Sequence, residues 1–195
     1  GVPVIALGRP MGVDSSLCYG NITSAGNTIR LPDSNYRFMT TDIYGSSTAS
    51  GVLINLRGQV VGLIDMSYNS SDLSNLISAI GISDIKRVVQ NLSNDKNIAY
   101  FGVYGVDVTE AVNQELEVPY GVYITEIDMD SPAMDAGIQS GDVIIKWNDT
   151  EITGYQELVN ALLMEEPEKT AKVTLMRQGP EGYTEMEATA TLGLK

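Results

Sequence analysis

SPAMDAGIQSGDVI, residues 131–144, decides the fold of the second half of this chain. Ser131 is a preferred helix N-cap, and Pro132 after it suits the first helical position, where an N–H has no partner within the helix. Gly137 marks the end of the same helix, because glycine readily adopts the backbone conformation that closes a helix. The β-branched and aromatic residues of 143–147 then read as a strand. The stretch therefore predicts a short helix with both ends marked, followed by a strand.

Further strands and one longer helix surround this stretch. Thr153 and Gln156 fit the capping box, in which a Thr and a Gln three residues later bond the open amides at a helix start. Leu158 and Leu162 follow at helical spacing. Four runs read as strands: Phe101–Val108, Tyr120–Ile127, Lys172–Arg177 and Tyr183–Thr191. Residues 99–195 are therefore expected to form one small α+β domain.

The first half consists of short apolar runs between turn residues. We expect the second run to end at a turn at Gly26-Asn27. The spacing of about ten residues between turns predicts an all-β barrel or sandwich. The runs are Val2–Leu7, Leu17–Ser24, Tyr36–Ile43, Val52–Leu56, Val60–Met66 and Leu76–Ile82.

Charge divides the chain at about the same place as the strand pattern. Residues 1–98 hold seven Lys and Arg, seven Asp and no Glu, whereas residues 99–195 hold five Lys and Arg against eighteen acidic residues. A polar run lies at this change, and such runs are typical of linkers. We predict one domain over residues 1–92, a linker over 93–98 and a second domain over 99–195.

Composition excludes several classes of function. The net charge of −13 argues against nucleic acid or an anionic membrane surface as a partner. The chain has no histidine, which removes the commonest general base and the commonest metal ligand. A single cysteine, Cys18, excludes an intrachain disulfide and a thiolate metal cluster. We expect no metal site and no cofactor.

The motifs and their order resemble the HtrA-type serine proteases, in which a trypsin-like domain precedes a PDZ domain. Residues 100–103, YFGV, resemble the family's Y-L-G-V loop, and residues 131–144 are close to S-P-A-x-x-A-G-[LI]-x-x-G-D-V-I. The resemblance implies a mainly β chain: a six-stranded trypsin-like β-barrel, the second half of a chymotrypsin-type fold, followed by an α+β PDZ domain. Further matching segments in the first half are residues 4–12, 20–25, 41–42 and 53–62.

The family's nucleophile motif, G-N-S-G-G-P, is altered to STASGV at residues 47–52. Counting forward from Asp42 by the family's spacing places the nucleophile at Ser50, and counting back from Leu53 places it at Ala49. The oxyanion hole needs the amide two residues earlier turned inward, a conformation that glycine eases. The family's catalytic His and Asp belong to a barrel preceding these residues, so we expect residues 1–195 alone to be inactive.

The resemblance also implies a carboxylate-binding loop, in which successive backbone N–H groups bind an anion. The peptide would add as a strand beside residues 103–106 and present its last side chain to the helix near Tyr155. Tyr155 is expected at the solvent edge, whereas Leu158 and Leu162 face either this pocket or the core. The expected peptide-binding residues are Tyr100, Phe101, Gly102, Val103, Tyr104, Tyr155, Leu158 and Leu162.

Two functions stay open at this point. The first is an HtrA-like serine endopeptidase in proteolysis and protein quality control, whose PDZ domain binds peptide C-termini. The second is a catalytically degenerate pseudoprotease that serves as a peptide-binding scaffold or sensor. The expected partners are C-termini with hydrophobic ends and neutral or basic neighbours, unfolded protein substrates in the active case, and further copies in a homo-oligomer. The resemblance implies a location outside the cytoplasm, with membrane anchoring through a preceding segment.

Overall fold

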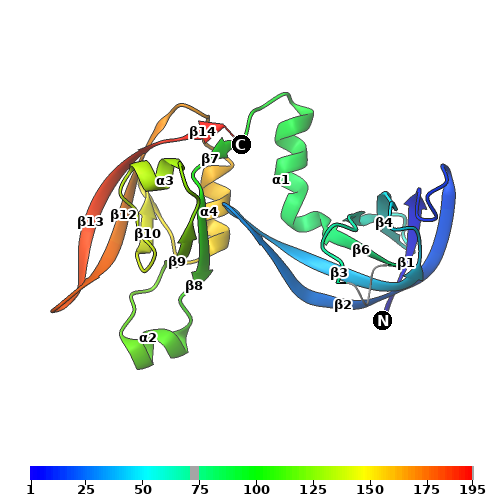
Figure 1. The fold of residues 1–195 in the computed structure, drawn as a ribbon, viewed down its shortest axis with the longest axis horizontal. Coiled ribbons are helices and arrows are strands. Elements are labelled where there is room, and N and C mark those ends of the chain that lie inside the picture. The colour runs from blue at the N-terminus through cyan, green and yellow to red at the C-terminus, as the bar shows by residue number, and fades with distance from the viewer. Residues whose placement is uncertain (71–74, 195) are drawn as a thin grey trace. The chain divides into compact units, whose positions relative to one another are not determined.

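The computed structural model describes residues 1–70 and 75–194, which form two compact units (Figure 1). One unit consists of residues 1–29 and 35–87, and the other of residues 30–34 and the chain from Val88 onwards. Along the sequence, the change at residues 87/88 falls within helix α1 (Ile82–Ser93). The linker at residues 93–98 stays a prediction.

The first unit is a closed six-stranded barrel, which confirms the predicted fold. Its strand order is β1-β2-β3-β6-β5-β4, and pairing of β1 with β4 closes the ring. Val4 and Ala6 on β1 are both fully buried, because alternate side chains of a strand point to the same face. The strands are β1 (Val2–Gly8), β2 (Ser16–Leu31), β3 (Ser34–Tyr44), β4 (Gly51–Asn55), β5 (Val60–Ile64) and β6 (Leu76–Gly81).

The turn between β2 and β3 is not where the sequence pattern predicted it. Strand β2 continues through Gly26-Asn27 to Leu31, and β3 begins at Ser34, so the expected turn at Gly26-Asn27 is wrong. Pro32 and Asp33 form the turn instead, and Asp33 has a φ of 58°. Proline fixes one backbone angle, and aspartate is among the few residues that tolerate a left-handed conformation.

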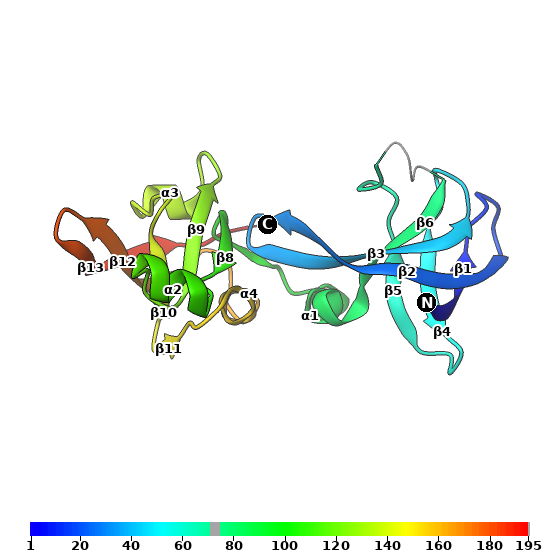
Figure 2. The same cartoon turned by 90° about the horizontal axis from the view of Figure 1, so that it is seen from below.

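The second unit is built on a sheet with the order β13-β12-β10-β9-β8 (Figure 2). Strand β11 pairs with β10, and β14 pairs with β7 in a separate two-stranded sheet. Strand β8 is therefore the last strand of the main sheet. The elements are β7 (Ala99–Tyr100), β8 (Val103–Asp107), α2 (Glu110–Leu116), β9 (Val122–Ile127), α3 (Pro132–Asp135), β10 (Val143–Trp147), β11 (Thr150–Glu151), α4 (Tyr155–Leu162), β12 (Thr170–Gly179), β13 (Gly182–Thr191) and β14 (Gly193–Leu194).

Helix α3 has the two marked ends that the sequence predicted. The Ser131 hydroxyl accepts a hydrogen bond from the Met134 amide at 3.3 Å, and Pro132 occupies the first turn. Gly137 follows with a φ of 80°. None of the helices in residues 1–70 and 75–194 combines the length and apolar character needed to span a membrane.

Asp142, in the GDVI part of the deciding stretch, joins the segment after α3 to strand β12. Its side chain is almost fully buried, and both of its oxygens accept bonds from the Arg177 guanidinium at 2.7 Å. It also accepts a bond from the Gln139 amide at 2.8 Å. This hydrogen bonding to Asp142 raises the pKa of Arg177. Asp142 therefore has a structural role in the turn before β10.

Helix α4 begins in a different way from the predicted capping box. Its N-cap is Gly154, which has no side chain to cap with, and the Tyr155 amide donates to Asp107 Oδ1 at 2.6 Å. The helix start is thus bonded by a carboxylate at the end of β8, so the capping role predicted for Thr153 is wrong. A carboxylate suits this position because it satisfies an open amide and complements the positive end of the helix dipole.

We expect Asp107→Ala to lower the free energy of unfolding by about 1 kcal/mol, the usual effect of losing an N-terminal helix cap. Thr153→Ala is the matched control and should change the stability by less than half of that value. Denaturant unfolding of both variants measures the difference. Equal losses in the two variants would contradict the cap assignment.

Candidate carboxylate-binding site

Three successive backbone amides between β7 and β8 point at one carboxylate within the second unit. The Phe101 amide donates to Asp33 Oδ2 at 2.8 Å, and the Val103 amide donates to Oδ1 at 3.0 Å. The Gly102 amide lies between them and donates to both oxygens at 3.0 Å. Asp33 belongs to the 30–34 segment that is part of this unit. The loop therefore has the geometry of a carboxylate-binding site made of main-chain N–H groups.

Gly102 allows the loop to turn its amides in this direction. It is buried and has a φ of 93°, a conformation that side chains disfavour. A Cβ added at this position would lie 2.3 Å from Ser131 Cβ and 2.9 Å from the Ser131 hydroxyl. Both the backbone angle and the close approach of Ser131 therefore require glycine here.

The carbonyl groups of the same loop point away from the carboxylate and accept hydrogen bonds from other backbone amides of this unit. Phe101 O accepts from the Ala133 amide at 2.9 Å, and Gly102 O accepts from the Asp128 amide at 2.9 Å. The Phe101 ring meets Trp147 edge-to-face, with the ring centroids 5.0 Å apart. These contacts fix the peptide planes of the loop, so the amides are held toward the carboxylate before any ligand binds.

The Val103 carbonyl adds an acceptor at the edge of the sheet. It accepts a bond from the Asp33 amide at 2.8 Å and one from the Tyr155 hydroxyl at 3.1 Å. Since β8 is the last strand of its sheet, its edge groups can pair with an added chain segment. The Asp33 amide makes this kind of main-chain bond.

Two tyrosines and a second carboxylate lie beside the loop. The Tyr100 hydroxyl donates to Asp128 Oδ2 at 2.6 Å. Burial, followed by this hydrogen bond, raises the pKa of Tyr100 far above its usual value. Burial also raises the pKa of Tyr104, with a further contribution from the Asp128 charge. Both phenols therefore stay neutral at physiological pH, and the surroundings of the loop are acidic.

The predicted peptide-binding residues lie around this loop, with their side chains mostly in the core. Phe101, Val103 and Leu158 are fully buried, and Leu162 is 2% exposed. Tyr155 is 4% exposed, so its expected place at the solvent edge is wrong. The Tyr155 hydroxyl donates a hydrogen bond to the Val103 carbonyl, and the Tyr155 amide donates one to Asp107. These two bonds hold the Tyr155 side chain in the interior. Tyr104 lies half-buried on β8 opposite Glu126.

Sequence reasoning missed Asp33. Its neighbours Pro32 and Ser34 are ordinary turn residues, and Asp33 itself is a common residue for a turn. Phe101 lies 68 residues further along the chain. The sequence holds no signal that links a turn aspartate to a loop at this distance.

The candidate nucleophile loop lies in the first unit, at the end of β3. Ser50 is exposed, whereas Ala49 is 7% exposed. The Thr48 amide, which would serve the oxyanion hole for Ser50, donates to Ser46 Oγ at 3.1 Å. The Ala49 amide donates to the Ser46 carbonyl at 2.9 Å. In the fully described loop 45–51, Gly51 alone has a positive φ. The assignment of the nucleophile to Ser50 or Ala49 stays a prediction.

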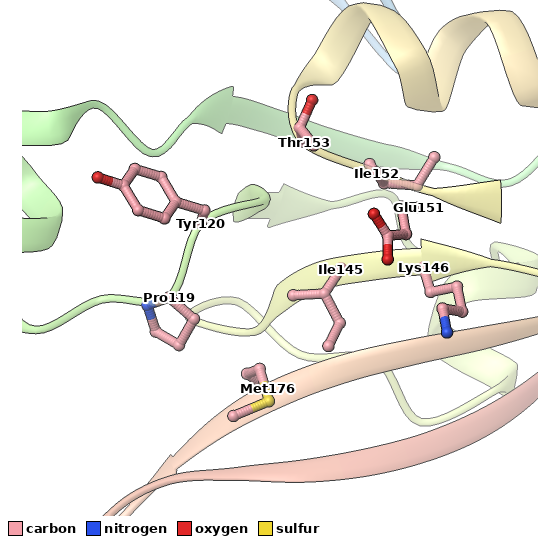
Figure 3. Close-up of a pocket in the computed structure, with 8 residues that line it drawn as sticks. All are labelled: Pro119, Tyr120, Ile145, Lys146, Glu151, Ile152, Thr153 and Met176. Atoms are coloured by element: carbon pink, nitrogen blue, oxygen red, sulfur yellow. The ribbon is translucent and has the colours of Figure 1, made fainter.

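A separate hollow of about 370 Å³ lies over β10 and β12 in the second unit (Figure 3). Lys146 and Glu151 face each other there on paired strands, beside apolar Ile145 and Met176. None of the predicted peptide-binding residues lines it. In the part of the chain that the structure describes, no three carboxylate or thiol groups gather closely enough to hold a metal ion.

Comparison with known proteins agrees with this architecture. The PDZ domain family model matches residues 76–187. A probable periplasmic serine endoprotease DegP-like from Hahella chejuensis is 32% identical over 187 residues, covering 91% of this chain and 39% of that protein. A serine protease Do-like HtrA from Lactococcus lactis subsp. lactis is 28% identical, covering 96% of this chain and 51% of that protein. The solved structure of the HtrA-type protease AlgW with decapeptide matches all of this chain and 61% of its own, with a TM-score of 0.65 and 22% identity.

The fold and the loop define a chain with a six-stranded β-barrel unit and a PDZ-type unit. The chain belongs to the PDZ domain family, and its PDZ domain is of the HtrA protease type, as the sequence motifs predicted. It spans about two fifths of the length of the first curated relatives it matches.

We expect Gly102→Ala to destabilise the second unit more than Gly137→Ala does. Both glycines have a positive φ, which costs alanine about 1 kcal/mol. A Cβ at Gly137 meets nothing within 4 Å, whereas a Cβ at Gly102 meets Ser131. The free energy of unfolding should therefore fall by at least about 2 kcal/mol in Gly102→Ala. Equal losses in denaturant unfolding would contradict the close approach described here.

Proposed function

We propose that the PDZ domain of this chain binds the C-terminal carboxylates of peptides and proteins. One observation carries the proposal: the amides of residues 101–103 hold the two oxygens of a carboxylate at 2.8–3.0 Å. A peptide C-terminus has the same two oxygens and the same charge. The same three N–H groups can therefore bind it without rearrangement of the loop.

The ligand would lie as an added strand along β8. The Val103 carbonyl then accepts a bond from the ligand's last amide, as it accepts one from Asp33. The PDZ unit is strongly acidic, and Asp128 and Glu126 lie near the loop. Repulsion therefore disfavours acidic tails and favours a hydrophobic last residue with neutral or basic neighbours. The AlgW structures solved with a decapeptide and with a tripeptide support peptide binding as the role of such a chain.

The test is calorimetric titration of residues 1–195 with a neutral hexapeptide that ends in Val, in its free-acid and C-terminally amidated forms. Amidation removes the charge and one acceptor oxygen. We expect it to weaken binding by about 1.5–3 kcal/mol, the usual contribution of a hydrogen bond to a charged group. Equal affinities for the two forms would contradict a carboxylate site.

A second function concerns the whole protein to which these residues belong. Its curated relatives are named as periplasmic serine endoproteases, which supports a role in proteolysis outside the cytoplasm. The loop at residues 46–50 favours the other possibility, a pseudoprotease scaffold, because the Thr48 amide is already bonded to Ser46. For the whole protein, the family resemblance also supports membrane anchoring and homo-oligomer formation. In the active case it supports unfolded proteins as substrates.

Labelling of the full-length protein with a fluorophosphonate distinguishes an active serine protease from a pseudoprotease. We expect no label on Ser50, because an oxyanion hole without its inward amide stabilises the reacting centre poorly. Ser50→Ala serves as the control for labelling elsewhere. Labelling that disappears in Ser50→Ala would overturn the pseudoprotease proposal and establish Ser50 as the nucleophile.

A further inference from the structure

We infer that this PDZ domain carries its own internal ligand, the segment Arg30–Ser34, and that peptide C-termini compete with Asp33 for the loop. The inference rests on the proposed function, because it concerns the same carboxylate site. It adds that the site is closed in the resting protein by a side-chain carboxylate from the same chain.

The bonds of Asp33 match those expected from the last residue of a bound peptide. Each carboxylate oxygen accepts two bonds from the loop, Oδ2 from Phe101 and Gly102 and Oδ1 from Gly102 and Val103. The Asp33 amide donates to the Val103 carbonyl at 2.8 Å. One residue thus supplies both the anion and the main-chain donor. All three loop amides are engaged, so a second carboxylate can bind only after Asp33 leaves.

Burial makes the two ligands mutually exclusive. Asp33 is 5% exposed and Ser34 is 4% exposed, so the segment fills the space beside the loop. A second carboxylate would also meet the charge of Asp33 in poorly solvated surroundings, where like charges repel strongly. A peptide C-terminus must therefore displace Asp33 from the loop, and the two carboxylates cannot bind at the same time.

The turn is suited to act as a tethered ligand. Pro32 restricts the backbone before Asp33, and Asp33 holds a φ of 58° in a two-residue turn between β2 and β3. A turn held in this shape loses little conformational entropy on binding. Because the segment is part of the same chain, its effective concentration at the loop is set by the chain and does not fall on dilution.

The Asp33→Asn variant removes the carboxylate but keeps the turn, so it tests the effect of the carboxylate by itself. Asparagine tolerates a positive φ as aspartate does, so the turn is kept. Its amide group replaces one acceptor oxygen with an NH₂ donor, which faces the N–H groups of the loop. Asp95→Asn is the matched control, since Asp95 is exposed, has a φ of 55° and undergoes the same change of charge.

The first measurement is titration of the free-acid hexapeptide ending in Val into wild type, Asp33→Asn and Asp95→Asn. An occupied site lowers the apparent affinity by the fraction of molecules that are open. We expect Asp33→Asn to bind the hexapeptide at least about tenfold more tightly than wild type does. Asp95→Asn should bind it with the affinity of wild type. Binding of the peptide by wild type as tightly as by a folded Asp33→Asn variant would overturn the inference.

The second measurement is hydrogen exchange of the Gly102 amide by NMR in the peptide-free proteins. We expect strong protection in wild type and in Asp95→Asn, and exchange at least about tenfold faster in Asp33→Asn. Rapid exchange in peptide-free wild type would overturn the inference even where Asp33→Asn fails to fold. If no protein binds the hexapeptide but Gly102 loses its protection only in Asp33→Asn, the internal ligand stands and the proposed binding of peptide C-termini fails.

Discussion

The positive φ of Gly102 is the constraint on which the PDZ site depends. It turns three amides to one side of the loop, while the Phe101 and Gly102 carbonyls bond the residues before and within α3 on the other side. Ser131 approaches so closely that no side chain fits at residue 102. The same serine caps α3, so the loop and the helix are fixed together. The packing of the short helix α3 against the loop therefore creates the carboxylate site.

Side chains and backbone have separate tasks in this unit. Phe101, Val103 and Leu158 are buried in one core, together with Trp147, and their packing holds the loop in place. The groups that face the carboxylate are N–H groups, which every residue except proline possesses. Substitution of a core side chain therefore affects binding through the stability of the loop.

The two candidate anion-binding loops of the chain differ in what their amides bond. At residues 101–103 the amides meet a carboxylate from a distant turn. At residues 48–49 they bond Ser46 within the same loop. A loop whose donors are satisfied locally has no need of a ligand, whereas a loop whose donors point outward must find an acceptor or remain unsatisfied. Asp33 is the acceptor that the PDZ loop finds in this chain.

The sequence by itself determined the local elements. Short apolar runs between turn residues indicated the barrel strands, and Ser131, Pro132 and Gly137 marked both ends of α3, because capping and turn preferences act over a few residues. Only the tertiary structure decided that Asp107 caps α4 in place of Thr153, that the turn lies at Pro32-Asp33 and that Asp33 occupies the loop. The cap of α4 and the bonds of Asp33 to the loop join residues 48 to 70 positions apart. An aspartate in a turn and an aspartate bound to three distant amides have the same local sequence, and only folding brings the amides to it.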